Sequence, residues 1–331
     1  MVDETTMCEH DVNNREERPS EKKLIIIPYA DLSDAQSGAN IGNITDRQEL
    51  YYKLCCTALV SAAMHNGNET DVALVTNRQV PQKYKRILEM NNVLIFYKEF
   101  DNFRFQNDYK WCLAFYKLCA FKYVVDCCDY DFYAYLDSDV YIKGSFDNIW
   151  QECRYNIMLY DFNSGLNERF YRRFLGEVED FTLNSGIVTH YGGEFCACSK
   201  ENALILTKHM QEIFDRMYAN GFVTLAGDEF ILSLSANLLK ERVKNAGAYV
   251  FRFWTGEYRI VTTAYKYNSN MCVLHCPQEK NRGLLKIFDR YIAVGKLPDI
   301  NKVYRLLHLN RRRLRIVLGE IKSKLIGVVK H

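Results

Sequence analysis

The chain has 331 residues, 48% of them hydrophobic and 25% charged, and a formal net charge of +2. This length predicts one large or two medium domains, and the apolar content is enough for a sizeable core. No apolar run approaches the ~18 residues that cross a bilayer, and the polar segment 1–23 lacks a secretion signal. We therefore expect neither a membrane-spanning nor an exported protein but a cytoplasmic one, whose 12 cysteines are reduced thiols.

The first half of the chain alternates strands with helices after a polar segment, 1–22, that is expected to be disordered. Four buried strands are predicted from apolar, β-branched runs at 24–27, 71–76, 93–97 and 132–136. Three helices are predicted between them at 45–67, 81–90 and 108–125. The first has a capping box from Thr45 to Gln48 and a C-cap at Gly67. This alternation predicts an α/β fold with a mostly parallel, Rossmann-type sheet, in which ligands bind beyond the carboxyl ends of the strands.

Beyond residue 150 the alternation loosens into a mixed half. Further strands are predicted at 156–160, 186–198 and 271–274, and residues 163–180 are expected to form a loop or a short helix. Two helices are predicted, one led by Ser199 and one running from Gly227 to about Asn245. Because no low-complexity linker separates the halves, we expect one composite domain over residues 23–298.

The strongest candidate site follows the fourth predicted strand. Tyr135-Leu-Asp137-Ser-Asp139-Val140 is an apolar strand that ends in two carboxylates with one residue between them. Alternate strand residues point the same way, so both carboxylates can bind one hard divalent cation, which then bridges a diphosphate. A turn without chemistry is the alternative, and the hydrophobic strand in front of the motif favours the site.

This motif resembles the DxD motif of glycosyltransferases with the GT-A fold, and the strand–helix order before it is similar too. In that family the two aspartates hold Mn²⁺ or Mg²⁺ on the diphosphate of a UDP-sugar. The resemblance implies that Asp137 and Asp139 are metal-linked and that Ser138 lies beside the ribose. It covers roughly residues 24–290 and implies a donor half up to residue 150 and an acceptor-binding half after it.

A histidine and a lysine late in the chain offer a third ligand and a phosphate contact. The last predicted strand ends at His275, and Lys280 follows five positions later. Imidazole binds Mn²⁺ well, and a lysine neutralises phosphate charge. In the glycogenin-like and lipooligosaccharide galactosyltransferase families, which these residues resemble, a late His is the third metal ligand and a nearby Lys contacts phosphate. The intervening Gly and the terminal Lys-Pro-Trp of that pattern are absent, so Arg282 and Lys286 are alternatives to Lys280. For the histidine, a structural role is the alternative.

A Gly-Gly segment and an acidic pair are candidates for the region around the transferred sugar. Gly192 and Gly193, followed by Glu194, let a backbone approach a ligand closely, or else form a β-bulge. The stretch resembles the Gly-Gly-x-Phe of blood-group-type transferases, which lies near the transferred sugar. In those enzymes one helix follows this stretch, and an Asp-Glu pair comes after the helix. The resemblance implies that this segment binds substrate and that Asp228 and Glu229 are catalytic. The alternative for that pair is a favourable contact with the helix dipole.

Further residues are candidates for binding the donor. Lys117, on the third predicted helix seven residues after Lys110, resembles the basic residue that these families place near the donor phosphates. Tyr29 and Asp31 end the first predicted strand and Asn77 ends the second, where a uracil or ribose sits in this fold. The alternative for Lys110 and Lys117 is that each lies on a solvated helix face and binds no ligand.

The C-terminal segment 299–331 carries nine Lys or Arg and two acidic residues, whereas the rest of the chain is mildly acidic. From Leu314 to Val328 its apolar residues fall on one face of a helix. A basic amphipathic helix of this kind lies on an anionic membrane surface, as does the C-terminal segment of the lipooligosaccharide galactosyltransferases. Docking on the protein body is the alternative. We expect peripheral membrane association, and no nucleic-acid partner because interleaved aromatic residues are lacking.

These features predict a hexosyltransferase that uses a UDP-sugar with Mn²⁺ or Mg²⁺ and transfers to a glycan or lipid-linked saccharide, as in polysaccharide biosynthesis. The resemblances favour retention of configuration, whereas an inverting enzyme would need a base on the acceptor hydroxyl. One alternative is a nucleotidyltransferase of related fold, although residues 28–42 lack the expected Gly-rich loop. The other is a non-catalytic relative that binds nucleotide-sugars or glycans.

Overall fold

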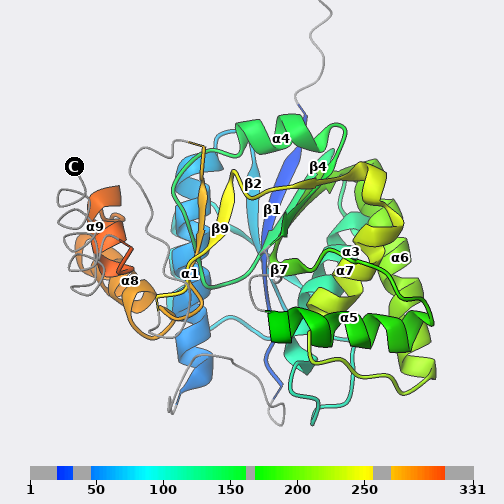
Figure 1. Cartoon of the computed structure of the whole chain (residues 1–331). Coiled ribbons are helices and arrows are strands. Elements are labelled where there is room, and N and C mark those ends of the chain that lie inside the picture. Colours follow the sequence, from blue (N-terminus) through cyan, green and yellow to red (C-terminus); the bar gives the residue numbers. More distant parts are fainter. Residues whose placement is uncertain (1–20, 33–45, 162–167, 256–269, 310–331) are drawn as a thin grey trace, which may run out of the picture.

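The computed structural model has a mixed α/β fold (Figure 1). It describes residues 21–32, 46–161, 168–255 and 270–309. Within them lies a seven-stranded, mostly parallel sheet, which confirms the predicted fold class. In spatial order its strands are β3 (Leu94–Tyr97), β2 (Asp71–Thr76), β1 (Lys23–Tyr29), β4 (Phe132–Leu136), β7 (Tyr191–Ser199), β6 (Ile157–Asp161) and β8 (Val243–Asn245). β7 is antiparallel to both of its neighbours, and the other pairs are parallel.

The parallel part of the sheet is built from strands that are buried on both faces. In β1, Leu24 and Ile26 face one core while Ile25 and Ile27 face the other, and each is at most 1% exposed. Burial on two faces requires continuous apolar runs rather than alternation of apolar and polar residues. Because β1 is parallel to both β2 and β4, the carboxyl ends of these three strands lie at one edge of the sheet.

Helices cover both faces of the sheet (Figure 1). One layer consists of α3 (Tyr116–Cys127), α5 (Glu168–Thr182), α6 (Lys200–Ala219) and α7 (Asp228–Leu238). The opposite layer consists of α1 (Arg47–Asn66), α2 (Gln82–Met90) and α4 (Asp147–Cys153). The apolar side chains of each central strand are therefore enclosed between two helical layers.

A second, smaller sheet brings a late part of the chain to the end of β4. Within the described residues it contains β5 (Val140–Ile142), β10 (Val273–His275) and β9 (Val250–Arg252), with β10 in the middle. β10 runs antiparallel to β5 and places His275 opposite Val140, immediately after the Asp-Ser-Asp motif. Two helices, α8 (Gly283–Val294) and α9 (Ile300–Leu306), contribute with α1 to a third apolar core.

The first helix begins one residue later than predicted. Its N-cap is Asp46, whose carboxylate accepts a hydrogen bond from Glu49 N at 2.8 Å, in place of the capping box of Thr45 and Gln48. An aspartate both satisfies a free N–H and brings a negative charge to the positive end of the helix dipole. The predicted C-cap at Gly67 is confirmed.

The third predicted helix is wrong at its start, because α3 begins only after a 3-10 turn, η1 (Cys112–Phe115). In front of that turn, Tyr109 donates a hydrogen bond from its hydroxyl to Thr224 O, in the loop before α7. This tertiary contact holds the segment in a turn conformation. Lys110 therefore does not lie on the helix that carries Lys117.

The second half contains most of the elements that the sequence did not indicate. The helix predicted from Gly227 to Asn245 ends at Leu238, and a 3-10 turn, η3 (Lys240–Arg242), leads into β8. This edge strand gains backbone hydrogen bonds by lying parallel to β6. α5 is a full 15-residue helix where a loop or a short helix was predicted. The strand predicted at 186–198 begins only at Tyr191, the first residue of β7. The sequence did not predict α4, β9, α8 or α9.

The predicted N-terminal segment and C-terminal amphipathic helix lie outside the described residues, apart from Glu21 and Lys22. The predicted tail starts at residue 299, yet α9 at its beginning contributes buried Val303 and Tyr304 to the third core. None of the described helices is both long and apolar enough to span a bilayer. The described cysteines are all free thiols, and most are buried, as predicted.

Candidate active site

The two aspartates of the Asp-Ser-Asp motif lie between β4 and β5. Asp137 N donates a hydrogen bond to Glu194 O at 3.1 Å, and Cys276 N donates to Asp139 O at 3.0 Å. These bonds tie the turn to β7 on one side and to the end of β10 on the other. Asp139 is 2% exposed, whereas Asp137 and Ser138 are partly open to solvent. One carboxylate is thus buried and the other accessible.

β10 brings a histidine to these two carboxylates. His275 Nε2 lies 3.3 Å from Asp139 Oδ2 and 4.0 Å from Asp137 Oδ2. One ligand atom from each of the three residues lies within 4.8 Å of the others. Two carboxylates and an imidazole at this spacing fit a divalent cation that accepts oxygen and nitrogen ligands. The three predicted ligands therefore converge, and they can hold such a cation.

A lysine completes this group. Lys280 Nζ lies 3.2 Å from Asp139 Oδ2 and 5.8 Å from the centre of the Tyr51 ring. Burial alone would raise the pKa of Asp139, but Lys280 and His275 hold it well below its usual range. Among Lys280, Arg282 and Lys286, Lys280 is the one with a described contact to the aspartates.

Behind His275 lies a buried ion pair. Glu194 on β7 is 0% exposed, and its two carboxylate oxygens accept hydrogen bonds from Arg252 Nε at 2.7 Å and Nη2 at 2.5 Å. Its Oε1 also lies 3.1 Å from His275 Nδ1. Burial would raise the pKa of Glu194, but Arg252 and His275 lower it to about 2. Burial would lower the pKa of His275, but Asp139 and Glu194 raise it to about 9.

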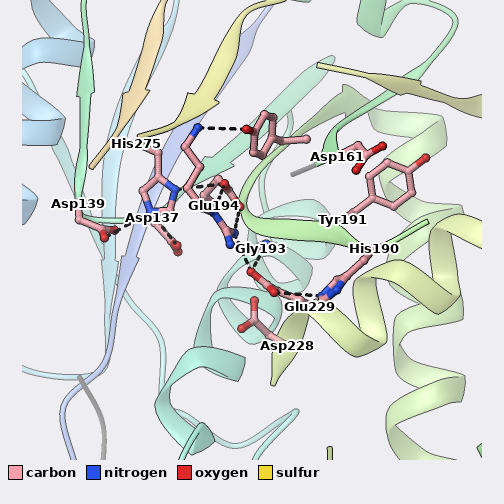
Figure 2. Close-up of polar contacts among 12 residues, drawn as sticks. Asp137, Asp139, Asp161, His190, Tyr191, Gly193, Glu194, Asp228, Glu229 and His275 are labelled. Carbon is pink, nitrogen blue, oxygen red and sulfur yellow. Dashed lines mark hydrogen bonds and ion pairs between the residues drawn. The ribbon is translucent and has the colours of Figure 1, made fainter. Parts of the chain in front are cut away.

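The same arginine reaches the N-terminus of α7. Arg252 Nη2 lies 2.7 Å from Glu229 Oε1, and Glu229 Oε2 lies 3.1 Å from His190 Nε2. The imidazole of His190 is stacked on Phe174, with ring centroids 4.0 Å apart. Burial opposes ionisation of Glu229, but Arg252 and His190 hold its pKa well below the usual range. Figure 2 shows these contacts running without a break from Asp139 to His190.

Asp228, next to Glu229, has the opposite electrostatic setting. It is 4% exposed, and Lys117 Nζ lies 3.0 Å from its Oδ2. Lys117 also donates to Asp137 Oδ1 at 2.6 Å and to Gly193 O at 3.0 Å. Burial, together with the charges of Glu229 and Asp137, raises the pKa of Asp228 to about 7, against the opposing effect of Lys117.

The paired glycines make room for these charged groups. A Cβ on Gly193 would lie 2.3 Å from Asp228 Oδ2 and 2.9 Å from Lys117 Nζ, and one on Gly192 would lie 1.9 Å from Glu194 Oε2. A side chain at either position would therefore displace a buried carboxylate. The pairing of β6 with β7 also shifts register at this point, so the segment has the irregularity of a β-bulge as well.

No protein-family model matches this sequence, and no curated protein matches it either. What the site does must therefore be inferred from its own geometry.

The residues predicted to bind the nucleoside lie at the carboxyl ends of β1 and β2. Asp31 N donates to Asn77 Oδ1 at 2.9 Å, and Asn77 Nδ2 donates to Asp31 O at 3.0 Å, so the two strand ends are joined. Tyr29 is stacked on Tyr51, with ring centroids 5.6 Å apart. Because Tyr51 is also the ring near Lys280, this region adjoins the aspartates.

Two residues of the contact network were not identified from the sequence. Arg252 stands alone among apolar residues in Tyr249-Val-Phe-Arg-Phe-Trp254, and a charged residue in such a run was the available signal for a buried ion pair. His190 had no comparable signal beyond its position before the two glycines. Lys110, a weaker candidate, lies over the ring of Trp111 at 4.9 Å and has no described contact with the network.

Proposed function

We propose that the protein is a metal-dependent glycosyltransferase that transfers a hexose from a UDP-sugar, with Asp137, Asp139 and His275 holding Mn²⁺ or Mg²⁺. One observation carries the proposal: these residues converge at the carboxyl edge of a mostly parallel sheet, beside the ends of β1 and β2. Ligands of open α/β sheets bind at this edge. The bound cation would neutralise the diphosphate and stabilise it as the leaving group.

Lys280 is the residue of this chain best placed to neutralise the departing diphosphate. It lies between Asp139 and the Tyr51 ring, on the side of the aspartates that faces the predicted nucleoside region. Although burial would lower its pKa, Asp139 raises it, so the ammonium group keeps its charge at neutral pH. A fixed positive charge at the position of the leaving group favours the transition state more than the ground state.

Of the two acidic residues on α7, Asp228 is the better candidate for direct contact with the sugar. Glu229 is neutralised by Arg252 and His190, whereas Asp228 shares its described cationic neighbour, Lys117, with Asp137. Lys117 lies between Asp137 and Asp228, and so joins the metal ligands to this second carboxylate. A carboxylate here can stabilise the positive charge that develops on the sugar, as retaining transfer requires.

The proposed acceptor is a glycan or a lipid-linked saccharide at a membrane surface. The loops that follow α5 and α6 lead to His190 and Asp228, and they contain no charged residue. Leu183 and Ile187 on the first loop are each 85% exposed, and Val223 on the second is 61% exposed. Exposed apolar side chains beside a polar site suit an acceptor that has both a sugar and a lipid part.

Calorimetric titration of UDP, UDP-sugars and other nucleotides, with Mn²⁺ or with EDTA, tests the proposal. We expect uridine nucleotides to bind only with metal, and Asp139→Asn to weaken this binding at least tenfold, because a buried ligand charge is lost. Asp147→Asn, an exposed aspartate at the start of α4, is the matched control and should bind normally.

The other outcomes separate the alternatives. Absence of uridine nucleotide binding, with or without metal, would exclude the UDP-sugar proposal. Preference for triphosphates with release of pyrophosphate would indicate a nucleotidyltransferase. Binding of UDP-sugars without consumption of any donor, over a panel of saccharide acceptors, would indicate a non-catalytic relative. If transfer occurs, proton NMR of the product decides between retention and inversion.

A further inference from the structure

We propose that Glu194 and Arg252 are positioning residues of the metal site, and that they join His275 and Glu229 into one rigid unit. The inference rests on the proposed function, because it assumes that His275 binds a metal. It gives Glu194 a role other than direct substrate binding, since its carboxylate is buried and fully engaged by protein groups.

The contact with Glu194 determines which imidazole nitrogen is available to a metal. His275 Nδ1 faces Glu194 Oε1 at 3.1 Å, and Nε2 faces Asp139 Oδ2 at 3.3 Å. An ionised carboxylate only accepts hydrogen bonds, so Nδ1 must carry a hydrogen. When a metal binds, Nε2 is then the nitrogen whose lone pair points toward the aspartates. A carboxylate behind a ligand histidine fixes the ring orientation and raises the basicity of the ligand nitrogen.

Glu194 is itself held in place by the planar fork of Arg252. Nε and Nη2 of the guanidinium bind the two oxygens of Glu194, and Nη2 also contacts Glu229. The backbone of this arginine is fixed as well, because Arg252 N donates to Tyr160 OH at 3.2 Å. A lysine has the same charge but no fork, so it cannot reproduce these bonds together.

The guanidinium of Arg252 lies close against the backbone of β7 at Gly192. A Cβ on Gly192 would lie 2.6 Å from Arg252 Nη2, so the guanidinium occupies the volume that a side chain there would fill. Without Arg252, the carboxylates of Glu194 and Glu229 would be buried without their main counter-charge. The arginine therefore sets the positions of a metal ligand on β10, through Glu194, and of a carboxylate on α7 at the same time.

The test measures Mn²⁺ affinity by electron paramagnetic resonance in the full-length protein without nucleotide. We expect Glu194→Gln and Arg252→Lys each to weaken Mn²⁺ binding about tenfold or more, the usual effect of losing a carboxylate contact behind a metal ligand. The matched control is Arg154→Lys, because Arg154 makes a similar two-pronged pair with Glu21 at 2.6 and 2.7 Å, next to α4. This control should retain the wild-type affinity.

A second measurement addresses the imidazole directly. In protein labelled with ¹⁵N-histidine and loaded with Zn²⁺, we expect Nε2 to be the metal-bound nitrogen and Nδ1 to carry hydrogen. Metal bound through Nδ1 would overturn the proposal, as would unchanged Mn²⁺ affinity in Glu194→Gln with a native circular dichroism spectrum. This variant keeps the size of the side chain, so it carries the test if Arg252→Lys does not fold. If the wild type binds no Mn²⁺, the proposed function fails too; if it binds and both variants bind equally, only the positioning role fails.

Discussion

The site has two ends, and the pKa of a buried carboxylate is lowered at one end and raised at the other. At the β4 end, Lys280 and His275 hold the pKa of Asp139 well below its usual range. At the α7 end, burial raises the pKa of Asp228 to about 7, although Lys117 lies only 3.0 Å away. Both side chains are almost inaccessible to solvent, so the degree of burial does not explain the difference.

The neighbouring charges explain it. Asp139 Oδ2 has two cationic neighbours, Lys280 Nζ at 3.2 Å and His275 Nε2 at 3.3 Å, whereas Asp228 shares Lys117 with Asp137 and lies near the like charges of Glu229 and Asp137. Burial makes every carboxylate harder to ionise, and nearby cations must outweigh both that cost and the repulsion of neighbouring carboxylates. The β4 end therefore presents an ionised ligand for a metal, while the α7 end presents a carboxyl group that exchanges its proton near neutral pH.

A substitution at Asp228 tests the assignment of roles at the α7 end and should change activity most. Asp228→Asn should lower kcat at least a hundredfold and leave the donor Kd within a few-fold, because the carboxylate acts when charge develops on the sugar. Steady-state kinetics and calorimetry with the preferred donor check this. Glu229→Gln is the comparison, and a larger loss of kcat there than in Asp228→Asn would reverse the two roles.

The next effect tests the β4 end. Lys280→Met should weaken binding of UDP about tenfold in the presence of Mn²⁺, because a fixed charge beside the diphosphate is lost. Lys110→Met removes an exposed lysine that has no described contact with the network, and it should bind UDP as the wild type does. Equal UDP affinity in the two variants would place the phosphates away from Lys280.

The third effect tests how closely the two ends are packed. Gly193→Ala should reduce the free energy of unfolding by about 1–3 kcal/mol, because its Cβ would meet Asp228 Oδ2 at 2.3 Å. Gly186→Ala is the control, since nothing lies within 4 Å of its Cβ position. Urea unfolding at pH 7 measures both. An equal change in the two variants would show that the space at Gly193 is not constrained.

The smallest effect tests the raised pKa of Asp228. The folded state binds this proton up to about pH 7, whereas the unfolded state, with a pKa near 3.8, releases it earlier. Wild-type stability should therefore fall as pH rises through 7, and Asp228→Asn should lack this loss. Between pH 6 and pH 8.5 the difference is about 1 kcal/mol. Urea unfolding with EDTA at the two pH values measures this difference. If the stability of the wild type and of Asp228→Asn changed equally with pH, the pKa of Asp228 would not be raised.

The sequence was informative wherever structure depends on local pattern. The interiors of β1, β2 and β4 are apolar because these strands are buried on both faces, and this is visible without any tertiary information. The Asp-Ser-Asp motif was identifiable for the same reason, since it directly follows one of these strands. Predictions were poorer where an element depends on a distant partner, as with the short edge strand β8 and the late start of α3.

The α/β class, the parallel strands and the carboxylates at the end of β4 could be predicted from consecutive residues, because apolar periodicity is a local property of the chain. Folding was needed to show that His275 lies at Asp139 and that Arg252 joins Glu194 to Glu229. The charge state of a buried carboxylate likewise depends on the distance of neighbours that come from other parts of the chain, so no local pattern encodes it.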